Sequence, residues 1–239
     1  MIYFICFIFG VLPSIVWLLF FLREDVHPES NRMILKVFGY GVLSAFLAAL
    51  LEINFQLGLN IISLPFFLSS ILQIFLGISL IEELMKYLVV KKAAISDPEF
   101  DEPLDAMLYM IIAGLGFAAI ENILYLLPFG QPFRIMDTMV LSLFRFLGAT
   151  FLHALCSGTI GFFLALSFRS KKPKKRLILF GIFLATFLHG LYNFSIIKFI
   201  ETLNNFLLLI PALILIGLAV FIFLAFQKLK KLSSACKLK

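Results

Sequence analysis

Long apolar runs, separated by short polar stretches, make up almost the whole chain. A helix that crosses the hydrocarbon core of a bilayer needs about 20 apolar residues, and seven runs are close to that length or longer. The third and fifth runs are longer than a bilayer requires, so we expect those helices to tilt or to protrude. The predicted spans are Ile2–Leu22, Met33–Leu51, Ile61–Val90, Leu104–Leu127, Thr138–Phe168, Leu177–Phe199 and Phe206–Gln227.

Basic residues alternate between rich and poor segments along the chain. The first, third and fifth loops and the C-terminal tail carry Lys and Arg, and the fifth loop reads RSKKPKKR at residues 169–176. The second loop has no basic residue, and Arg134 and Lys198 stand alone in the fourth and sixth. Cytoplasmic loops of membrane proteins carry an excess of Lys and Arg. The pattern therefore predicts an all-α polytopic bundle of about seven transmembrane helices, with the N-terminus outside and the C-terminus in the cytoplasm.

Composition leads to the same class of protein. Of the 239 residues, 62% are hydrophobic and 14% are charged, which is too little polar surface for a soluble domain of this size. The net charge of +6 reflects the clustered loop residues, and no nucleic-acid motif accompanies it. Cys6, Cys156 and Cys236 are far apart and lack metal-ligand spacing. We therefore expect one integral-membrane domain that contacts lipid and no nucleic acid.

Polar side chains interrupt four of the predicted spans. Charges are rare inside membranes because burying them in hydrocarbon is expensive, and those that occur are by default candidates for a functional site. At about 1.5 Å of rise per residue, the carboxylates and imidazoles among them are compatible with one layer near the middle of the membrane; these are Glu82, Glu83, Glu121, His153 and His189. The full polar set comprises Glu82, Glu83 and Lys86 in the third span, Glu121 and Asn122 in the fourth, Arg145 and His153 in the fifth, and His189 and Asn193 in the sixth.

Helical spacing predicts how some of these side chains face. Glu82 and Lys86 are four residues apart, so they share a helix face and we expect them to form an ion pair. Glu83 is rotated by about 100° from Glu82 and is expected to face something else. His189 and Asn193 are also four residues apart, so the amide can orient the imidazole. Glu52 and Glu201 fall near predicted span ends and are expected at the interface.

Three chemistries fit these residues. A desolvated carboxylate is a competent general base, so Glu82 or Glu83 can activate a water while His153 and His189 hold it, polarise a carbonyl or protonate a leaving amine. A zinc site is the rival, with His153, His189 and Glu121 or Glu83 as ligands, although no HExxH spacing is present. A proton or ion path, or an inert polar network, is the third. We favour the metal-free version and expect no cofactor, with zinc as the alternative.

Four segments of the chain resemble the PrsW family of intramembrane proteases, in family order. Phe117 and Glu121 fall on a Phe-x-x-x-His element of the wider superfamily of CAAX prenyl endopeptidases and bacteriocin-processing enzymes. A glutamate at that position is typical of PrsW-like proteins and argues against a prenyl endopeptidase. The segments are EELMKY (Glu82–Tyr87), DEPLDAMLYMIIAGLGFAAIENILY (Asp101–Tyr125), FLHALCSGTIGFFLA (Phe151–Ala165) and FLHGLYNF (Phe187–Phe194).

This resemblance implies a peptide hydrolase of the bacterial plasma membrane. Its one protease domain would cover residues 1–239, with a catalytic core at about 61–199. Its expected substrate is a membrane protein, such as a single-pass anti-sigma factor that is cut near the outer face before a second protease acts. Which of the two adjacent glutamates is the base stays open. The expected catalytic residues are Glu82, Glu83, His153 and His189, and the expected supporting residues are Lys86, Glu121, Asn122 and Asn193.

Overall fold

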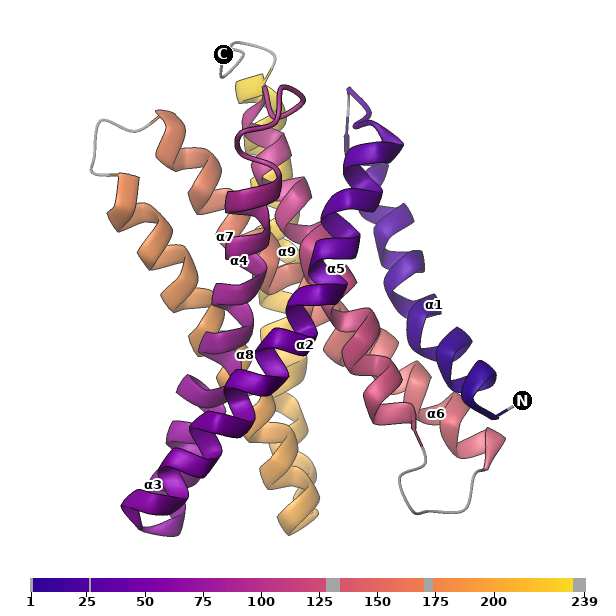
Figure 1. Cartoon of the computed structure of the whole chain (residues 1–239), viewed down its shortest axis with the longest axis vertical. Helices are drawn as coiled ribbons and strands as arrows, with labels where there is room; N and C mark the ends of the chain where they lie inside the picture. The colour runs from indigo at the N-terminus through magenta and orange to yellow at the C-terminus, as the bar shows by residue number, and fades with distance from the viewer. Residues whose placement is uncertain (1, 26, 128–133, 170–173, 234–239) are drawn as a thin grey trace.

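The computed structural model describes residues 2–25, 27–127, 134–169 and 174–233, and this part of the chain is helical and without strands. Seven helical units in it are long and apolar enough to cross a membrane, which confirms the predicted fold class (Figure 1). The α-helices are α1 (Ile2–Leu22), α2 (Asn31–Ile62), α3 (Phe66–Leu72), α4 (Ile81–Ala93), α5 (Pro103–Leu126), α6 (Ile135–Arg145), α7 (Phe151–Arg169), α8 (Lys174–Thr202) and α9 (Leu209–Ser233). Two π-helical segments, η1 (Gln73–Leu80) and η2 (Phe146–Thr150), and one 3₁₀ turn, η3 (Asn205–Leu208), join them.

The second predicted span is wrong at its C-terminal end. We expected it to stop at Leu51, before the polar residue Glu52, but α2 continues to Ile62 and ends at Ser63 in the left-handed conformation. The helix continues because its polar side chains find partners along it: the amide of Gln56 donates to Asn60. The third span consequently begins later than predicted.

Each of the two longest predicted spans is one apolar unit that contains a π-helical segment. η1 joins α3 to α4, and η2 joins α6 to α7. A π-helical turn releases carbonyl groups from the regular helical pattern. The hydroxyl of Ser79 donates to the carbonyl of Ile74 at 2.9 Å, and the indole of Trp17 in α1 donates to the carbonyl of Phe146 at 2.9 Å. These side-chain hydrogen bonds satisfy carbonyl groups in the two irregular segments.

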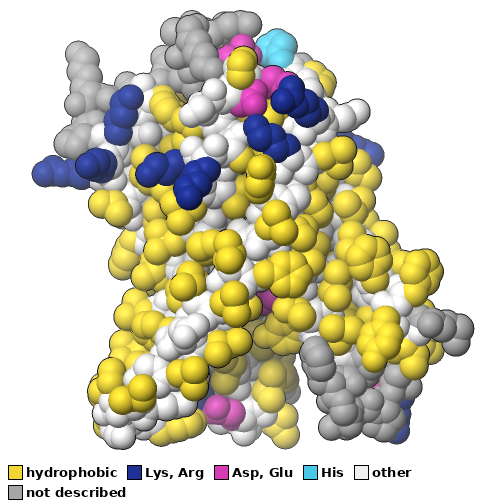
Figure 2. Space-filling view, viewed as in Figure 1, with side chains coloured by type: hydrophobic (Ala, Val, Ile, Leu, Met, Phe, Trp, Pro, Cys, Tyr) yellow, Lys and Arg dark blue, Asp and Glu magenta, His cyan; other side chains and the backbone are white. Residues whose placement is uncertain are grey.

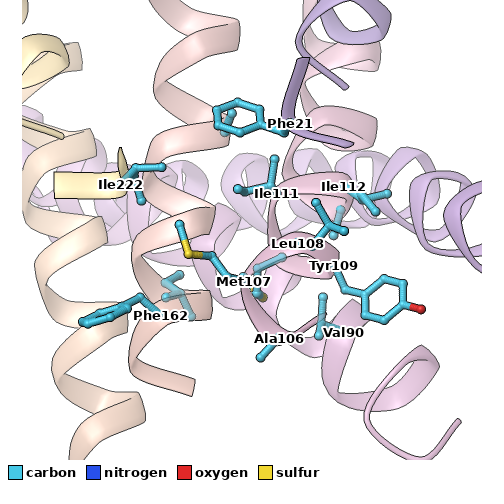
Figure 3. Packing of buried hydrophobic residues seen from close by; sticks show 14 of the residues in the cluster. Phe21, Val90, Ala106, Met107, Leu108, Tyr109, Ile111, Ile112, Phe162 and Ile222 are labelled. Carbon is cyan, nitrogen blue, oxygen red and sulfur yellow. The ribbon is translucent and has the colours of Figure 1, made fainter. Parts of the chain in front are cut away.

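Helix α5 is the centre of the bundle. It packs against α1, α2, α4, α7 and α9, and most of its residues are buried (Figures 1 and 3). Figure 3 shows Phe21, Val90, Phe162 and Ile222, from four surrounding helices, around the α5 side chains. Pro103 begins α5 and a capping box formed by Glu102 and Asp105 satisfies its first turn. A helix apolar on all sides is expected at the middle of a bundle.

Two glycines bring α2 and α5 into close contact. A Cβ atom on Gly41 would collide with the backbone of Ala113 and lie 3.2 Å from its Cα. A Cβ atom on Gly116 would collide with the carbonyl of Phe38 and lie 3.2 Å from its Cα. Small residues allow helix backbones to approach closely in a membrane. These reciprocal contacts fix how α2 lies against the central helix.

The helix ends next to the basic segments lie at one end of the molecule. This end holds the C-terminal ends of α1, α4, α7 and α9 and the starts of α2, α5 and α8, and the opposite end holds the starts of α1 and α6 and the C-terminal ends of α2 and α5 (Figure 1). Lys and Arg side chains gather at the former end, above a mainly hydrophobic flank (Figure 2). We call these the basic end and the opposite end. The assignment of the basic end to the cytoplasm stays a prediction from the sequence.

Side-chain contacts at the basic end tie the α1–α2 loop to the α4–α5 loop. The hydroxyl of Ser30 donates to Glu99 at 2.5 Å, and Lys36 pairs with Asp97 at 3.0 Å. The phenol of Tyr109 donates to the carboxylate of Glu29, which lies before the start of α2. Burial raises the pKa of Glu29 to about 8, and the neighbouring carboxylate of Asp105 adds to the effect, while the Tyr109 hydrogen bond opposes it.

We expect Gly41→Ala to destabilise the protein and Gly39→Ala, on the same helix, to leave its stability equal or higher. The added methyl group at Gly41 meets backbone that cannot yield, whereas nothing lies within 4 Å of a Cβ at Gly39. Overpacking of this kind costs about 1–3 kcal/mol. Thermal denaturation of both variants in detergent checks this, and equal midpoints would contradict the close α2–α5 contact.

We expect the folded protein to lose stability as the pH rises from 4.5 to about 8. The pKa of Glu29 is raised above its ordinary value of 4.5, so the folded state holds its proton more tightly than the unfolded state does. This contribution is complete below pH 4.5 and is lost as the pH passes about 8. Glu29→Gln should flatten that part of the stability profile, and Glu201→Gln, at an exposed site, should not. A Glu29→Gln profile parallel to wild type would refute the assignment.

Candidate active site

Four helices contribute the buried polar side chains that the sequence singled out. Glu82, Glu83 and Lys86 lie in the first turns of α4, directly after η1. His153 lies in the first turn of α7, directly after η2, and Glu121 lies near the C-terminal end of α5. His189, in the middle of α8, completes the group. Both π-helical segments therefore stand immediately before a cluster residue, a position at which such segments are often found.

The Lys86 ammonium lies at the centre of the cluster. Its Nζ is 2.8 Å from Oε1 of Glu83, 3.2 Å from Oε2 of Glu82 and 2.7 Å from Nδ1 of His153. The predicted Glu82–Lys86 ion pair is present, but the expectation that Glu83 faces elsewhere is wrong. Residues three apart on a helix are also neighbours, and the long lysine stem places its ammonium between both carboxylates. One cation thus bridges both glutamates and the imidazole of another helix.

The hydrogen bonds around His153 define which of its nitrogens carries the proton. An ammonium has no acceptor, so Nδ1 of His153 must accept from Lys86. The other nitrogen, Nε2, then carries the hydrogen and donates to Oε2 of Glu121. Arg145 forms an ion pair with the same carboxylate oxygen at 3.3 Å. The chain from Lys86 through His153 to Glu121 and Arg145 therefore orients the imidazole from both sides.

His189 is oriented by Glu83. Its Nδ1 lies 2.9 Å from Oε1 of Glu83, and its ring meets the ring of His153 edge to face, with centroids 5.1 Å apart. Among the described residues no hydrogen bond joins Asn193 to His189, so the imidazole is oriented by Glu83, and a supporting role for Asn193 stays a prediction. A shared helix face places two side chains near each other, but here the imidazole turns toward the interior, where Glu83 lies.

Asn122 ties the cluster to α1 and to the π-helical segment η2. Its amide nitrogen donates to the hydroxyl of Thr150 at 2.9 Å and to the carbonyl of Gly10 at 3.2 Å. Its amide oxygen accepts from Nε of Arg145 at 2.6 Å. Asn122 and Arg145 therefore lie outside the central group of carboxylates and imidazoles. Asn122 holds Arg145, and Arg145 positions Glu121 through their ion pair.

Two contributors to this region were absent from the expected site. Glu52 was placed at the membrane interface, yet it lies within α2 and lines one cavity together with Ile78, which is one helical turn before Glu82. Tyr125, one turn after Glu121, lays its ring over the Arg145 guanidinium at 4.1 Å. The four-residue spacing of Glu121 and Tyr125 was the sequence signal that could have indicated Tyr125. Glu52 could be placed only once the full length of α2 was known.

Glu201 lies in the last turn of α8, where it is exposed and paired with Lys198. Its expected place at the membrane interface stays a prediction.

Four of the cluster residues suit a metal ion by type and by proximity. Glu82, Glu83, His153 and His189 each offer one ligand atom, these atoms lie within 4.8 Å of one another, and the four residues are 0–4% exposed. Ligand atoms on a tetrahedral zinc ion are about 3.4 Å apart, so a moderate contraction would suffice. The second carboxylate oxygen of Glu83 is buried and has no hydrogen-bond partner, which also favours a cation. Glu121 is outside this group because it binds the far nitrogen of His153.

Comparison with known proteins points to one family. A family model described as PrsW family intramembrane metalloprotease matches residues 29–225. A protein named Protease PrsW from Geobacillus kaustophilus is 31% identical over 190 residues, which cover 79% of this chain and 78% of that protein. Proteins of the same name from Oceanobacillus iheyensis and Bacillus subtilis are 31% and 27% identical, each over 77% of this chain and 80% and 79% of their own lengths. No solved structure matches.

Proposed function

The chain belongs to the PrsW family of intramembrane proteases, a multi-pass protein class of the cell membrane, and we propose that its peptide-bond hydrolysis takes place at Glu82, Glu83, His153 and His189. One observation carries this proposal. Four side chains able to exchange protons, from three helices, meet among buried residues in a protein that is otherwise strongly apolar. Such groups in a membrane protein usually mark the site of its chemistry.

Glu83 is the proposed general base. Its Oε1 is held between Lys86 and His189, whereas its Oε2 has no hydrogen-bond partner and is free to accept a proton. Water gives a proton to this oxygen while its own oxygen attacks the carbonyl carbon of the peptide bond. Glu83 then passes the proton to the leaving amine nitrogen as the carbon–nitrogen bond breaks. Protons and charges balance over the two steps.

The remaining residues hold the reactants and the charge. The Lys86 ammonium lies between the two carboxylates and offsets negative charge that develops on the substrate oxygen. Glu82, whose Oε2 is 3.7 Å from His153 and 3.9 Å from His189, keeps the two imidazoles near that charge. Glu121, Asn122 and Arg145 are positioning residues that act through His153.

A zinc-dependent version is the second candidate, and the family's description as metalloproteases favours it. Glu82, Glu83, His153 and His189 would hold the ion, with Glu121 fixing the ring of His153. When bound, zinc would supply Lewis-acid activation of water or of the carbonyl group. The Lys86 ammonium favours the metal-free version, because its Nζ lies 2.7–3.2 Å from three of the four residues in that group.

The proposed substrate is a single-pass membrane protein of the anti-sigma type, cleaved toward the outer side of the membrane. Counted from the basic end, Glu83 lies about 15 Å along its helix, His153 and His189 about 22–24 Å and Glu121 about 27 Å, at 1.5 Å per residue. With the basic end on the cytoplasmic side, as the sequence predicts, these depths support cleavage at or beyond the bilayer midpoint. A membrane-spanning segment can reach this depth without a soluble domain on the protease.

We expect Glu83→Gln and His189→Ala each to abolish cleavage of a substrate while leaving expression and folding intact. Glutamine keeps the size of Glu83 but cannot take the proton, and alanine removes the imidazole beside it. Co-expression with tagged single-pass membrane proteins, followed by immunoblotting for the shortened product, measures this. Glu201→Gln, a matched carboxylate change on an exposed part of α8, is the control and should cleave normally.

Normal proteolysis by both variants at normal expression would overturn the site assignment. The transport alternative gives a different result in the same assay. It predicts no shortened product with any variant, and ion flux in proteoliposomes that contain the wild-type protein.

Metal analysis separates the two versions of the mechanism. In the metal-free version, the purified wild-type protein retains activity after chelation, and its zinc content equals that of the His153→Ala/His189→Ala variant. In the zinc version, the wild type holds about one zinc per chain, the double variant holds less, and chelator abolishes an activity that added zinc restores. Mass spectrometric metal content and cleavage rate are measured on the same preparations.

A further inference from the structure

An open cavity lined by both apolar and polar side chains lies between α2 and η1, one helical turn from the catalytic cluster. Its volume is about 310 Å³, at the lower end of the range of ligand-binding pockets, so it suits a short stretch of chain. Ile78, which lines it, is one helical turn before Glu82. The lining residues are Glu52, Ile53, Gln56 and Leu57 of α2 and Gln73 and Ile78 of η1.

Three polar side chains line the cavity in a region where the other lining residues are apolar. Ile53 and Leu57 are 58% and 55% exposed, as expected for side chains that face lipid, yet three of the six lining residues are Glu or Gln. The side-chain oxygen of Gln73 is buried and has no hydrogen-bond partner. The amide of Gln56 donates to Asn60, which leaves its carbonyl oxygen available.

Gly77 makes room for the Gln73 side chain. A Cβ atom at Gly77 would lie 2.7 Å from Oε1 of Gln73 and 2.6 Å from the ring of Phe55. The glutamine side chain therefore packs against Gly77. Its amide lines the cavity and its oxygen has no hydrogen-bond partner, so it is available to a bound peptide group after a small side-chain movement.

Intramembrane proteolysis creates a need for such groups. A peptide bond inside a transmembrane helix is shielded, so the substrate must unwind near the scissile bond before water can attack. Unwound backbone in hydrocarbon has unsatisfied N–H and C=O groups, each costing several kcal/mol, and it is tolerated only where protein or water satisfies them. A cavity that offers one carboxylate and two amides, one helical turn from Glu82, supplies such groups.

We propose that this cavity binds the unwound backbone of the substrate beside the scissile bond, with the amides of Gln56 and Gln73 hydrogen-bonding to its peptide groups. The occupant is an extended stretch of a membrane-spanning polypeptide. The proposal rests on the proposed function, since it assigns to the same site the residues that select substrates able to unwind.

Binding of two synthetic peptides tests the proposal without requiring catalysis. Both peptides have a core of about 20 Leu and Ala residues flanked by lysines; one has a central Gly–Gly pair, which weakens the helix by about 1 kcal/mol per glycine, and the other has Leu–Leu. Labelled Glu83→Gln protein in proteoliposomes binds each peptide, and energy transfer reports the affinity. We expect the Gly–Gly peptide to bind at least threefold more tightly.

Adding Gln73→Leu or Gln56→Leu should remove most of that preference, by about three- to tenfold, which corresponds to one membrane hydrogen bond. Adding Gln227→Leu, at an exposed site on α9, should leave it unchanged. Equal thermal denaturation midpoints show that the variants are folded, and the two independent glutamine changes guard against failure of either one. Equal binding of both peptides by the Glu83→Gln protein, or a preference that survives both changes, would overturn the proposal.

The result is separable from the proposed function. If wild type cleaves neither peptide but the glutamine changes abolish the binding preference, the cavity assignment stands and the hydrolytic role of the cluster is in doubt. If wild type cleaves the Gly–Gly peptide and the glutamine changes alter neither its KM nor its binding, the cluster assignment stands and the cavity assignment fails.

Discussion

The buried ammonium of Lys86 is the interaction on which the rest of the site depends. It is fully buried, and it lies within hydrogen-bonding distance of Glu83, Glu82 and His153. Two adjacent carboxylates in an apolar interior would repel each other, and removing one partner of a buried ion pair typically costs about 3–5 kcal/mol. The ammonium allows both glutamates to remain close together in the bundle, and its bond to His153 joins α4 to α7.

The bundle positions these groups by a few close contacts. Helix α5 brings Glu121 and Asn122 to the cluster from the centre, and the glycine contacts with α2 fix how closely α2 approaches it. The π-helical segments η1 and η2 stand before Glu82 and His153, and hydrogen bonds from Ser79 and Trp17 satisfy carbonyl groups within them. Irregular helical geometry thus occurs where the protein needs chemistry rather than regular packing.

The sequence alone was sufficient to predict seven membrane-crossing units and to single out the polar side chains that the structure brings together. Apolar runs of bilayer length predict the seven membrane-crossing units, and charges within those runs stand out because hydrocarbon disfavours them. It was insufficient wherever an outcome depended on another helix. The Glu83–Lys86 contact, the pairing of His189 with Glu83 in place of Asn193, and the proximity of Glu52 to the cluster all require distances between helices. Periodicity describes one helix at a time.

We propose that Glu83 and the imidazoles around it hydrolyse a peptide bond within the membrane. To test this, the purified protein is reconstituted in liposomes with a single-pass substrate that co-expression has shown to be cleaved, and both product ends are sequenced by mass spectrometry. We expect new ends inside the membrane-spanning segment, at or beyond its midpoint as counted from the basic end, and no product with Glu83→Gln. Product ends in a water-exposed part of the substrate, or the same products from Glu83→Gln, would contradict it.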